Sequence, residues 1–235
     1  MKKTLLLGML AVGSLTLNSC NELQQVLSQT AQSGSLNVAG GLKQALELGV
    51  SAGVDALSKD GGYFKDQAVR ILLPEELQKV DKTLRSIGLG SLADQGLKVL
   101  NEAAENAVSQ AKPIFLSAIQ NMTFTDAMNI LKGDNTAATT YLKNTTYSSL
   151  ESAFAPKIQS SLSEVGADKV WENIINKYNQ IPLVKPVEAN LTKYVTEQAI
   201  NGLFVKVGDK EKEIRTNIAA RTTPLLKSVF AMQDK

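Results

Sequence analysis

Apolar residues recur at helical spacing along nearly the whole chain after residue 41. Side chains three, four or seven residues apart share one face of an α-helix, so this spacing predicts helices that each bury one face. The first of these helices also carries small residues beside its apolar face, where a neighbouring helix can approach closely. The apolar face consists of Leu42, Leu46, Val50, Val54 and Leu57, and the small residues are Ala45, Gly49 and Gly53.

Glycine and proline divide the rest of the chain into further helices. The long run over 136–165 is expected to be interrupted at Pro156, because proline lacks the N–H that a helix interior uses. The helix that begins at Leu191 either continues past Gly208 or ends there, before a charged turn over 209–213. The other expected elements are a loop over 59–70 and helices over 74–87, 92–108, 113–119, 123–132, 170–178 and 223–230.

The local signals agree with an all-helical fold. Thr123 and Asp126 have the spacing of a capping box, with Asp in place of the usual Glu, and Gly133 ends the helix that they begin. No segment shows the two-residue alternation of a strand. The sequence therefore predicts an all-α fold, a single globular domain of about eight or nine helices over 42–235.

The first twenty residues look like a bacterial lipoprotein signal. Lys2 and Lys3 precede an uncharged stretch over 5–17 that is too short to span a bilayer, and the only cysteine follows as Leu17-Asn18-Ser19-Cys20. In such signals the cysteine takes a diacylglycerol and becomes the first mature residue. The alternative is an ordinary signal peptide with a cysteine nearby. We expect a signal peptide over 1–19 and membrane attachment through lipid on Cys20.

The segment over 20–41 is rich in Gln, Ser, Asn and Gly, with scattered Leu and Val. This composition predicts a flexible polar tether behind the lipid, with at most a short helix over 22–29. Asn21 is not the aspartate that retains lipoproteins at the inner membrane in some bacteria. The expected location is therefore the outer membrane of a bacterial cell envelope.

The charge balance makes nucleic acid an unsuitable partner. The chain has 25 Lys+Arg against 23 Asp+Glu, and loss of Lys2 and Lys3 with the signal leaves 23 of each. A mature domain without net charge lacks the basic surface that phosphate backbones require. We expect no nucleic-acid binding.

The sequence contains no histidine, which excludes several classes of site. Ser-His-Asp and Cys-His nucleophile systems and histidine-rich zinc sites all need this residue. There is also no P-loop and no dinucleotide-binding motif after a strand. No metal and no cofactor are expected, and carboxylate, lysine, tyrosine or hydroxyl chemistry and binding remain.

Glu102 and Glu105 are the candidate catalytic residues. They lie three positions apart and therefore on one face of the helix over 92–108, a spacing suited to a general acid and base or to oxygen ligands of a cation. The alternative is a solvated face, or carboxylates paired with Arg70 or another arginine.

Two other groups of side chains are candidates for contact with a ligand or partner. Arginine is scarce relative to lysine, and each candidate arginine lies close to an expected helix boundary, where it suits either a structural clamp or recognition of an anionic partner. An aromatic pair on one helix face suits either core packing or a face against headgroups or a partner helix. The arginines are Arg70, Arg215 and Arg221, and the aromatic pair is Trp171 and Tyr178.

Seven short segments carry a family resemblance, in order along nearly the whole mature domain: RILLPE at 70–75, GLG at 88–90, NEAAE at 101–105, AKPIF at 111–115, YVT at 194–196, GLF at 202–204 and RTTPLL at 221–226. Together they resemble a bacterial envelope family catalogued only as domain-of-unknown-function family 4197. Its members commonly carry an export signal, often with a lipidation cysteine. They commonly have proline where this chain has Leu72, arginine where it has Glu102 and aspartate where it has Asn201. The resemblance implies a fold and a location, and it implies no activity or cofactor.

The sequence leaves three functional hypotheses. The first is a non-enzymatic envelope lipoprotein that binds a protein or an apolar ligand in a groove between helices. The second is an enzyme that uses the carboxylates of Glu102 and Glu105 on an envelope polymer such as a glycan, which requires a carboxylate pair facing an open cleft. The third is a purely structural spacer.

Overall fold

The structure is a computed structural model that describes residues 19–86, 88, 90–164, 166–179 and 190–233. The chain forms two parts, residues 1–36 and residues 37–235, and each is considered by itself. In the first part the described residues, from Ser19, are helical. The described residues form nine α-helices and one short 3₁₀-helix: α1 (Ser19–Leu57), α2 (Glu75–Ser86), α3 (Gly90–Val108), α4 (Ala111–Gln120), α5 (Phe124–Lys132), α6 (Ala137–Glu164), α7 (Ala167–Asn179), α8 (Leu191–Thr216), η1 (Ile218–Ala220) and α9 (Pro224–Phe230).

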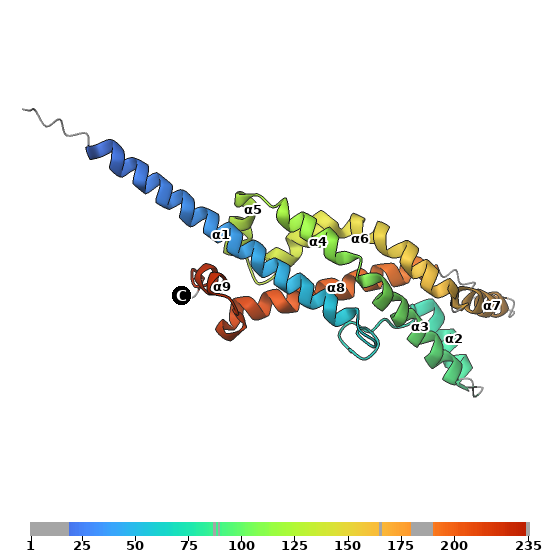
Figure 1. Ribbon diagram of the computed structural model, residues 1–235. Coiled ribbons are helices and arrows are strands. Elements are labelled where there is room, and N and C mark those ends of the chain that lie inside the picture. Colours follow the sequence, from blue (N-terminus) through green and yellow to red (C-terminus); the bar gives the residue numbers. More distant parts are fainter. Residues whose placement is uncertain (1–18, 87, 89, 165, 180–189, 234–235) are drawn as a thin grey trace, which may run out of the picture. The chain divides into compact units, whose positions relative to one another are not determined.

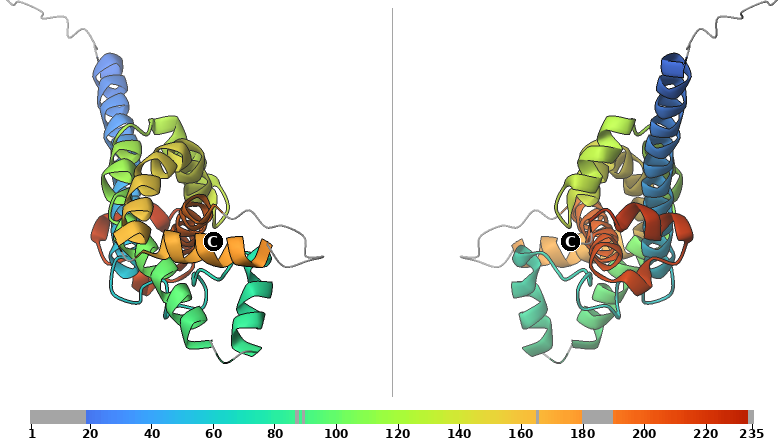
Figure 2. Two further views of the ribbon diagram at one scale, coloured as in Figure 1. Left: turned by 90° about the vertical axis from the view of Figure 1, so that its right-hand side faces the viewer. Right: turned by 90° about the vertical axis from the view of Figure 1, so that its left-hand side faces the viewer.

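The second part is built around α6 and α8, which pack against each other (Figure 1). α6 also contacts α3, α4, α5 and α7, while α2 and α3 form a helical hairpin (Figure 2). The buried residues of α6 recur every four positions, and a row of that spacing winds slowly around a helix with about 3.6 residues per turn. The helix therefore buries different sides along its length against different neighbours. This row is Ala138, Leu142, Thr146, Leu150, Phe154, Ile158 and Leu162.

The small residues of α1 receive α8, as the sequence predicts. A Cβ atom added to Gly53 would lie 3.6 Å from Cβ of Lys206, and one added to Gly49 would lie 3.8 Å from Cβ of Lys210. At Gly41 an added Cβ would collide with Val229 of α9. The ridge of small residues is therefore a contact within the fold.

The predicted all-α class and the predicted number of helices are confirmed in the described residues. The capping box is also present, because Thr123 N–H donates to Asp126 Oδ2 at 3.0 Å and Asp126 N–H donates to Thr123 Oγ1 at 3.1 Å. Gly88 and Gly166, at two predicted helix ends, have φ of +83° and +66°, which only glycine adopts at little cost.

Two helices, α1 and α6, extend further than the sequence pattern suggests, and α8 takes the longer of its two predicted courses. α6 continues through Pro156, because Phe154 and Ile158 on either side of it are fully buried. α8 continues past Gly208, and the charged run over 209–213 is helical rather than a turn. α1 begins at Ser19, so residues 20–41 are helical, although their role as a tether remains a prediction.

The expected connection around Pro182 and Pro186 lies outside the described residues. In the part of the chain that the structure describes, none of the helices combines the length and the apolar character needed to cross a membrane.

Candidate functional site

The loop over residues 58–74, which joins α1 to α2, is fastened to α3 by a buried carboxylate. Glu105 accepts hydrogen bonds from the backbone N–H groups of Gly61, Tyr63 and Phe64 at 3.1, 3.0 and 3.2 Å. Only 6% of Glu105 is exposed. Hydrogen bonds to an ionised acceptor are stronger than neutral ones, so this carboxylate fixes the first turn of the loop. We call residues 58–74 the clamped loop.

A second residue of α3 holds the end of the clamped loop. The side chain of Asn101 accepts a hydrogen bond from Ile71 N–H at 2.8 Å and donates one to Ile71 C=O at 2.9 Å. The amide thus pairs with one residue of extended chain as a neighbouring strand would. Tyr194 of α8 donates from its hydroxyl to Leu72 C=O at 2.9 Å.

Tyr63 connects the clamped loop to α8. The side chain is fully buried, and its hydroxyl donates to Ala199 C=O at 2.8 Å. Burial, together with the negative charge of Glu105, raises the pKa of the Tyr63 hydroxyl, which keeps it protonated as a donor. The ring packs on Gly202, where an added Cβ would lie only 2.8 Å from Tyr63 Cε1.

The clamped loop explains where the two predicted carboxylates lie. Glu105 is buried with its oxygens bonded to backbone N–H groups, whereas Glu102 is exposed and pairs with Lys98 at 3.2 Å. Their environments therefore differ, and they do not form a pair open to one cleft. The arginine partner considered for them is also not found, because the partners of Glu105 are main-chain groups.

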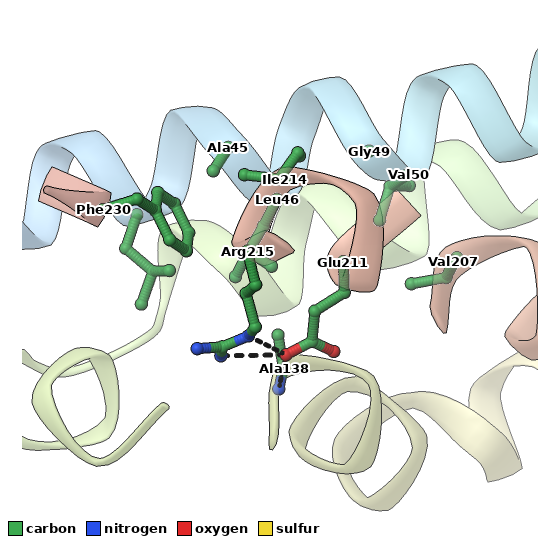
Figure 3. A pocket seen from close by; sticks show the side chains of 11 residues that line it. Ala45, Leu46, Gly49, Val50, Ala138, Val207, Glu211, Ile214, Arg215 and Phe230 are labelled. Carbon is green, nitrogen blue, oxygen red and sulfur yellow. Dashed lines mark hydrogen bonds and ion pairs between the residues drawn. The ribbon is translucent and has the colours of Figure 1, made fainter. Parts of the chain in front are cut away.

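Arg215 lies at the meeting of α5, α6 and α8 (Figure 3). It pairs with Glu211 at 2.9 Å and donates to Ile130 C=O in the last turn of α5 at 2.8 Å. Glu211 in turn accepts hydrogen bonds from the N–H groups of Ala138 and Thr139 in the first turn of α6, at 2.9 and 2.8 Å. Glu211 faces the N-terminal end of α6, where the helix dipole is positive, and Arg215 faces the C-terminal end of α5, where it is negative. These dipoles favour both ions despite their burial.

Arg221 is the third predicted arginine and is 1% exposed. It donates to Ile214 C=O and Arg215 C=O at the end of α8, each at 3.0 Å. The guanidinium groups of Arg215 and Arg221 also lie within 6 Å of the ring centre of Phe230, at 5.8 and 5.7 Å. Their contacts are those of structural clamps between the last helices.

A small cavity lies beside the Glu211–Arg215 pair, under α1 (Figure 3). It is lined mainly by apolar side chains, including Leu42, Val50 and Phe230. Its volume of about 20 Å³ accommodates about one water molecule and is far below the roughly 300–1,000 Å³ of small-molecule pockets. The cavity is too small for an acyl chain.

Wider hollows lie on the surface of the second part. One of about 530 Å³ lies between α4 and α6 and is lined by uncharged side chains such as Ile114 and Tyr141. Another, of about 440 Å³, lies where α6, α7 and the start of α8 meet. A third, of about 280 Å³, lies between α1, the clamped loop and α8, beside Asp66 and Lys206. The described residues that line these hollows include neither of the predicted carboxylates and none of the candidate arginines.

Arg70 differs from the other arginines. Its guanidinium lies 4.4 Å from the ring centre of Phe64, its side chain is half-buried, and its Nε is buried without a hydrogen-bond partner. Among the described residues its side chain forms no ion pair and no hydrogen bond, and Nε is its only nitrogen atom that is buried without a partner, so the two Nη atoms reach solvent. The remaining arginine, Arg85, pairs with Asp81 at 3.1 Å and Asp94 at 2.6 Å. Of the four arginines of the chain, Arg70 is the one whose guanidinium has neither an ion pair nor a hydrogen bond in the described structure.

The other candidates from the sequence are placed as follows. Trp171 is buried and packs on Gly96, which confirms core packing, while the side chain of Tyr178 lies outside the described part. Cys20 is in α1, and its side chain is likewise not described. Among the described residues no group of three or more Cys, Asp or Glu side chains is arranged to hold a metal ion.

Asn101, Tyr63 and Tyr194 were not predicted as site residues. Asn101 and Tyr194 do lie in segments that carry the family resemblance, and these segments meet at the clamped loop. An uncharged amide on the buried stripe of an otherwise apolar helix is the signal that identifies Asn101 as an anchor, because a buried amide needs partners.

Comparison with known proteins identifies a family of unknown function. The family model described as "Protein of unknown function (DUF4197)" matches residues 32–231. No curated protein and no solved structure matches the chain.

Proposed function

The chain belongs to the family of proteins of unknown function DUF4197, and we propose that it is a lipid-anchored bacterial envelope protein whose helical domain is a binding module. In this proposal Cys20 carries the lipid, and the clamped loop presents Arg70 to an anionic partner. The domain does no covalent chemistry.

The unpaired charge of Arg70 carries this proposal. A guanidinium stacked on an aromatic ring is held in one plane, so little freedom is lost when its exposed nitrogen atoms find an acceptor. The loop beneath it is fixed by Asn101, Glu105 and Tyr194. A fixed loop that presents an unpaired cation is typical of a recognition surface.

The carboxylate-dependent enzyme is the weaker alternative. A glycosidase-type mechanism needs two carboxyl groups that face the same substrate. Glu105 is committed to three backbone N–H groups and Glu102 to Lys98, so their contacts support anchoring of the loop and a solvated face. The cavity beneath α1 is too small to hold an apolar ligand.

Photo-crosslinking in cells tests the proposed function. Leu72 is 56% exposed on the clamped loop, and Ile218 is 61% exposed on η1, so a photoreactive residue at either position faces solvent. We expect a discrete crosslinked product from position 72 that disappears when Arg70→Ala is added. Position 218 is the matched control and should not yield that product. The same products from both positions would contradict a binding role for this loop, and a product at 72 that persists without Arg70 would contradict recognition through Arg70.

A further inference from the structure

The clamped loop places an apolar side chain on the same side as Arg70. Residues 70–73 lie outside the helices, and their burial alternates from one residue to the next, as it does where alternate side chains point to opposite sides. Ile71 and Leu73 are buried at 2% and 4% exposure, whereas Arg70 is half-buried and Leu72 is exposed. Arg70 and Leu72 therefore share the outward side of this segment.

Around the clamped loop, the described residues leave one net positive charge: Arg70 and Lys59 form no ion pair there, and the buried carboxylate of Glu105 offsets one of these two cations. Lys65 lies 3.6 Å from Asp60, and Lys206 of α8 lies 2.5 Å from Asp66, so these four charges cancel in pairs. The hydrogen bond from Lys206 holds the pKa of Asp66 below its usual value, which keeps that pair ionised. Anionic membrane surfaces and nucleic acids bind clusters of several cations, so a single monovalent anion suits this surface better.

The choice of arginine over lysine points to a planar acceptor. A lysine could supply the same charge over Phe64 without burying an unpaired Nε–H, which is an unfavourable feature of the present arrangement. Arginine adds a planar fork of N–H donors, and this fork matches the two oxygens of a carboxylate.

We propose that the outward side of residues 70–73 binds one carboxylate that is flanked by an apolar group, as on a protein partner with an acidic residue beside an apolar one. The Nη atoms of Arg70 hold the carboxylate, and Leu72 covers the apolar group. This inference rests on the proposed binding function and names the chemical group that is recognised.

A side-chain NMR titration tests the chemistry directly. The probes are hexanoate, acetate, hexanamide and inorganic phosphate, added to the full chain with Cys20→Ser, which carries no lipid. The chain has only four arginines, and Arg70→Lys identifies the Nε–H signal of Arg70. The signals of Arg215 and Arg221 report in each variant whether the fold is intact.

We expect hexanoate to shift the Arg70 signal in a saturable manner and hexanamide to leave it unchanged. Acetate should bind more weakly than hexanoate, and Leu72→Ser should weaken hexanoate binding by about fourfold, the effect of losing roughly one methylene of apolar contact. Arg85→Lys, a change at a paired arginine, is the control and should not alter hexanoate binding.

Three results would overturn the inference. They are tighter binding of phosphate than of hexanoate, an equal response to hexanoate and hexanamide, and no response of the Arg70 signal to any probe. None of them affects the crosslinking experiment, so a product at position 72 that depends on Arg70 would still support the proposed function. Conversely, hexanoate binding without such a product would support the chemistry of the site and contradict the proposed function.

Discussion

The buried polar side chains of the second part bind main-chain atoms. Asn101 and Glu105 bond to the clamped loop, Glu211 to the first turn of α6, and Arg215 and Arg221 to the ends of α5 and α8. Helix ends and turns leave backbone groups without partners, and a buried group of that kind needs a side chain when water is excluded. This requirement explains the charged residues inside the fold without any catalytic role.

The structure predicts different effects of removing Glu105 and Glu102. Glu105→Ala leaves three inner N–H groups without their acceptor and should lower the free energy of unfolding by about 3 kcal/mol. Glu102→Ala removes only an exposed pair with Lys98 and should change it by about 0.5 kcal/mol or less. Denaturant unfolding of the two variants measures the difference. Equal losses would mean that Glu105 does not anchor the clamped loop.

Glu102 and Glu105 also show what the sequence could not reveal about single residues. Glu102 and Glu105 are three positions apart, and helical spacing alone makes them equivalent neighbours. Their difference comes from a loop more than 30 positions earlier in the chain, which covers Glu105 and leaves Glu102 in solvent. Only the tertiary contact of residues 61–64 with α3 separates an anchor from a surface charge.

At the scale of elements, helices persist where their neighbours support them. The sequence correctly predicts helices from apolar spacing and their ends from Gly88, Gly133 and Gly166. It overstates the effect of Pro156 and leaves the effect of Gly208 open. The helices continue through both residues, because the cost of each is local, whereas burial of the flanking turns acts over the whole helix. The charged run over 209–213 contains Glu211, whose pairing with Arg215 requires the spacing of a continuing helix.

Two glycines of α8 should respond to alanine with opposite signs. At Gly202 the new Cβ would lie 2.8 Å from Tyr63 and 3.2 Å from Val69, so Gly202→Ala should destabilise the fold by about 1–3 kcal/mol. At Gly208 the nearest atom would be Thr139 Oγ1 at 3.6 Å, an ordinary contact, so Gly208→Ala should stabilise it by about 0.5–1 kcal/mol. Thermal unfolding of both variants gives the signs. A stable Gly202→Ala variant would show that α8 and the clamped loop are not in close contact.

At the scale of the whole molecule, the sequence predicts the all-α class well and the site poorly. The class follows from a period that recurs in every segment, whereas the site depends on which segments meet. The segments that resemble the family lie far apart in sequence, and two of them, at Asn101 and Tyr194, reach consecutive residues of the clamped loop. The spacing of apolar residues carries no information about which distant segments come into contact. The sequence therefore predicts Arg70 as a candidate residue but does not predict the loop that positions it.

Attachment to the membrane is the prediction that concerns the whole chain. Cys20→Ser should move the protein from the membrane fraction to the soluble fraction, because acyl chains at about 0.8 kcal/mol per buried methylene supply the attachment in our proposal. Its thermal unfolding should stay the same, since the described core begins at Leu42. Fractionation of cells after a salt wash measures the first effect, and Ser19→Ala, a small residue exchanged for another, is the control. If Cys20→Ser still sediments with membranes as the parent does, the prediction of a lipid anchor is wrong. The binding role of Arg70 would then have to be tested without assuming that its partner lies in the cell envelope.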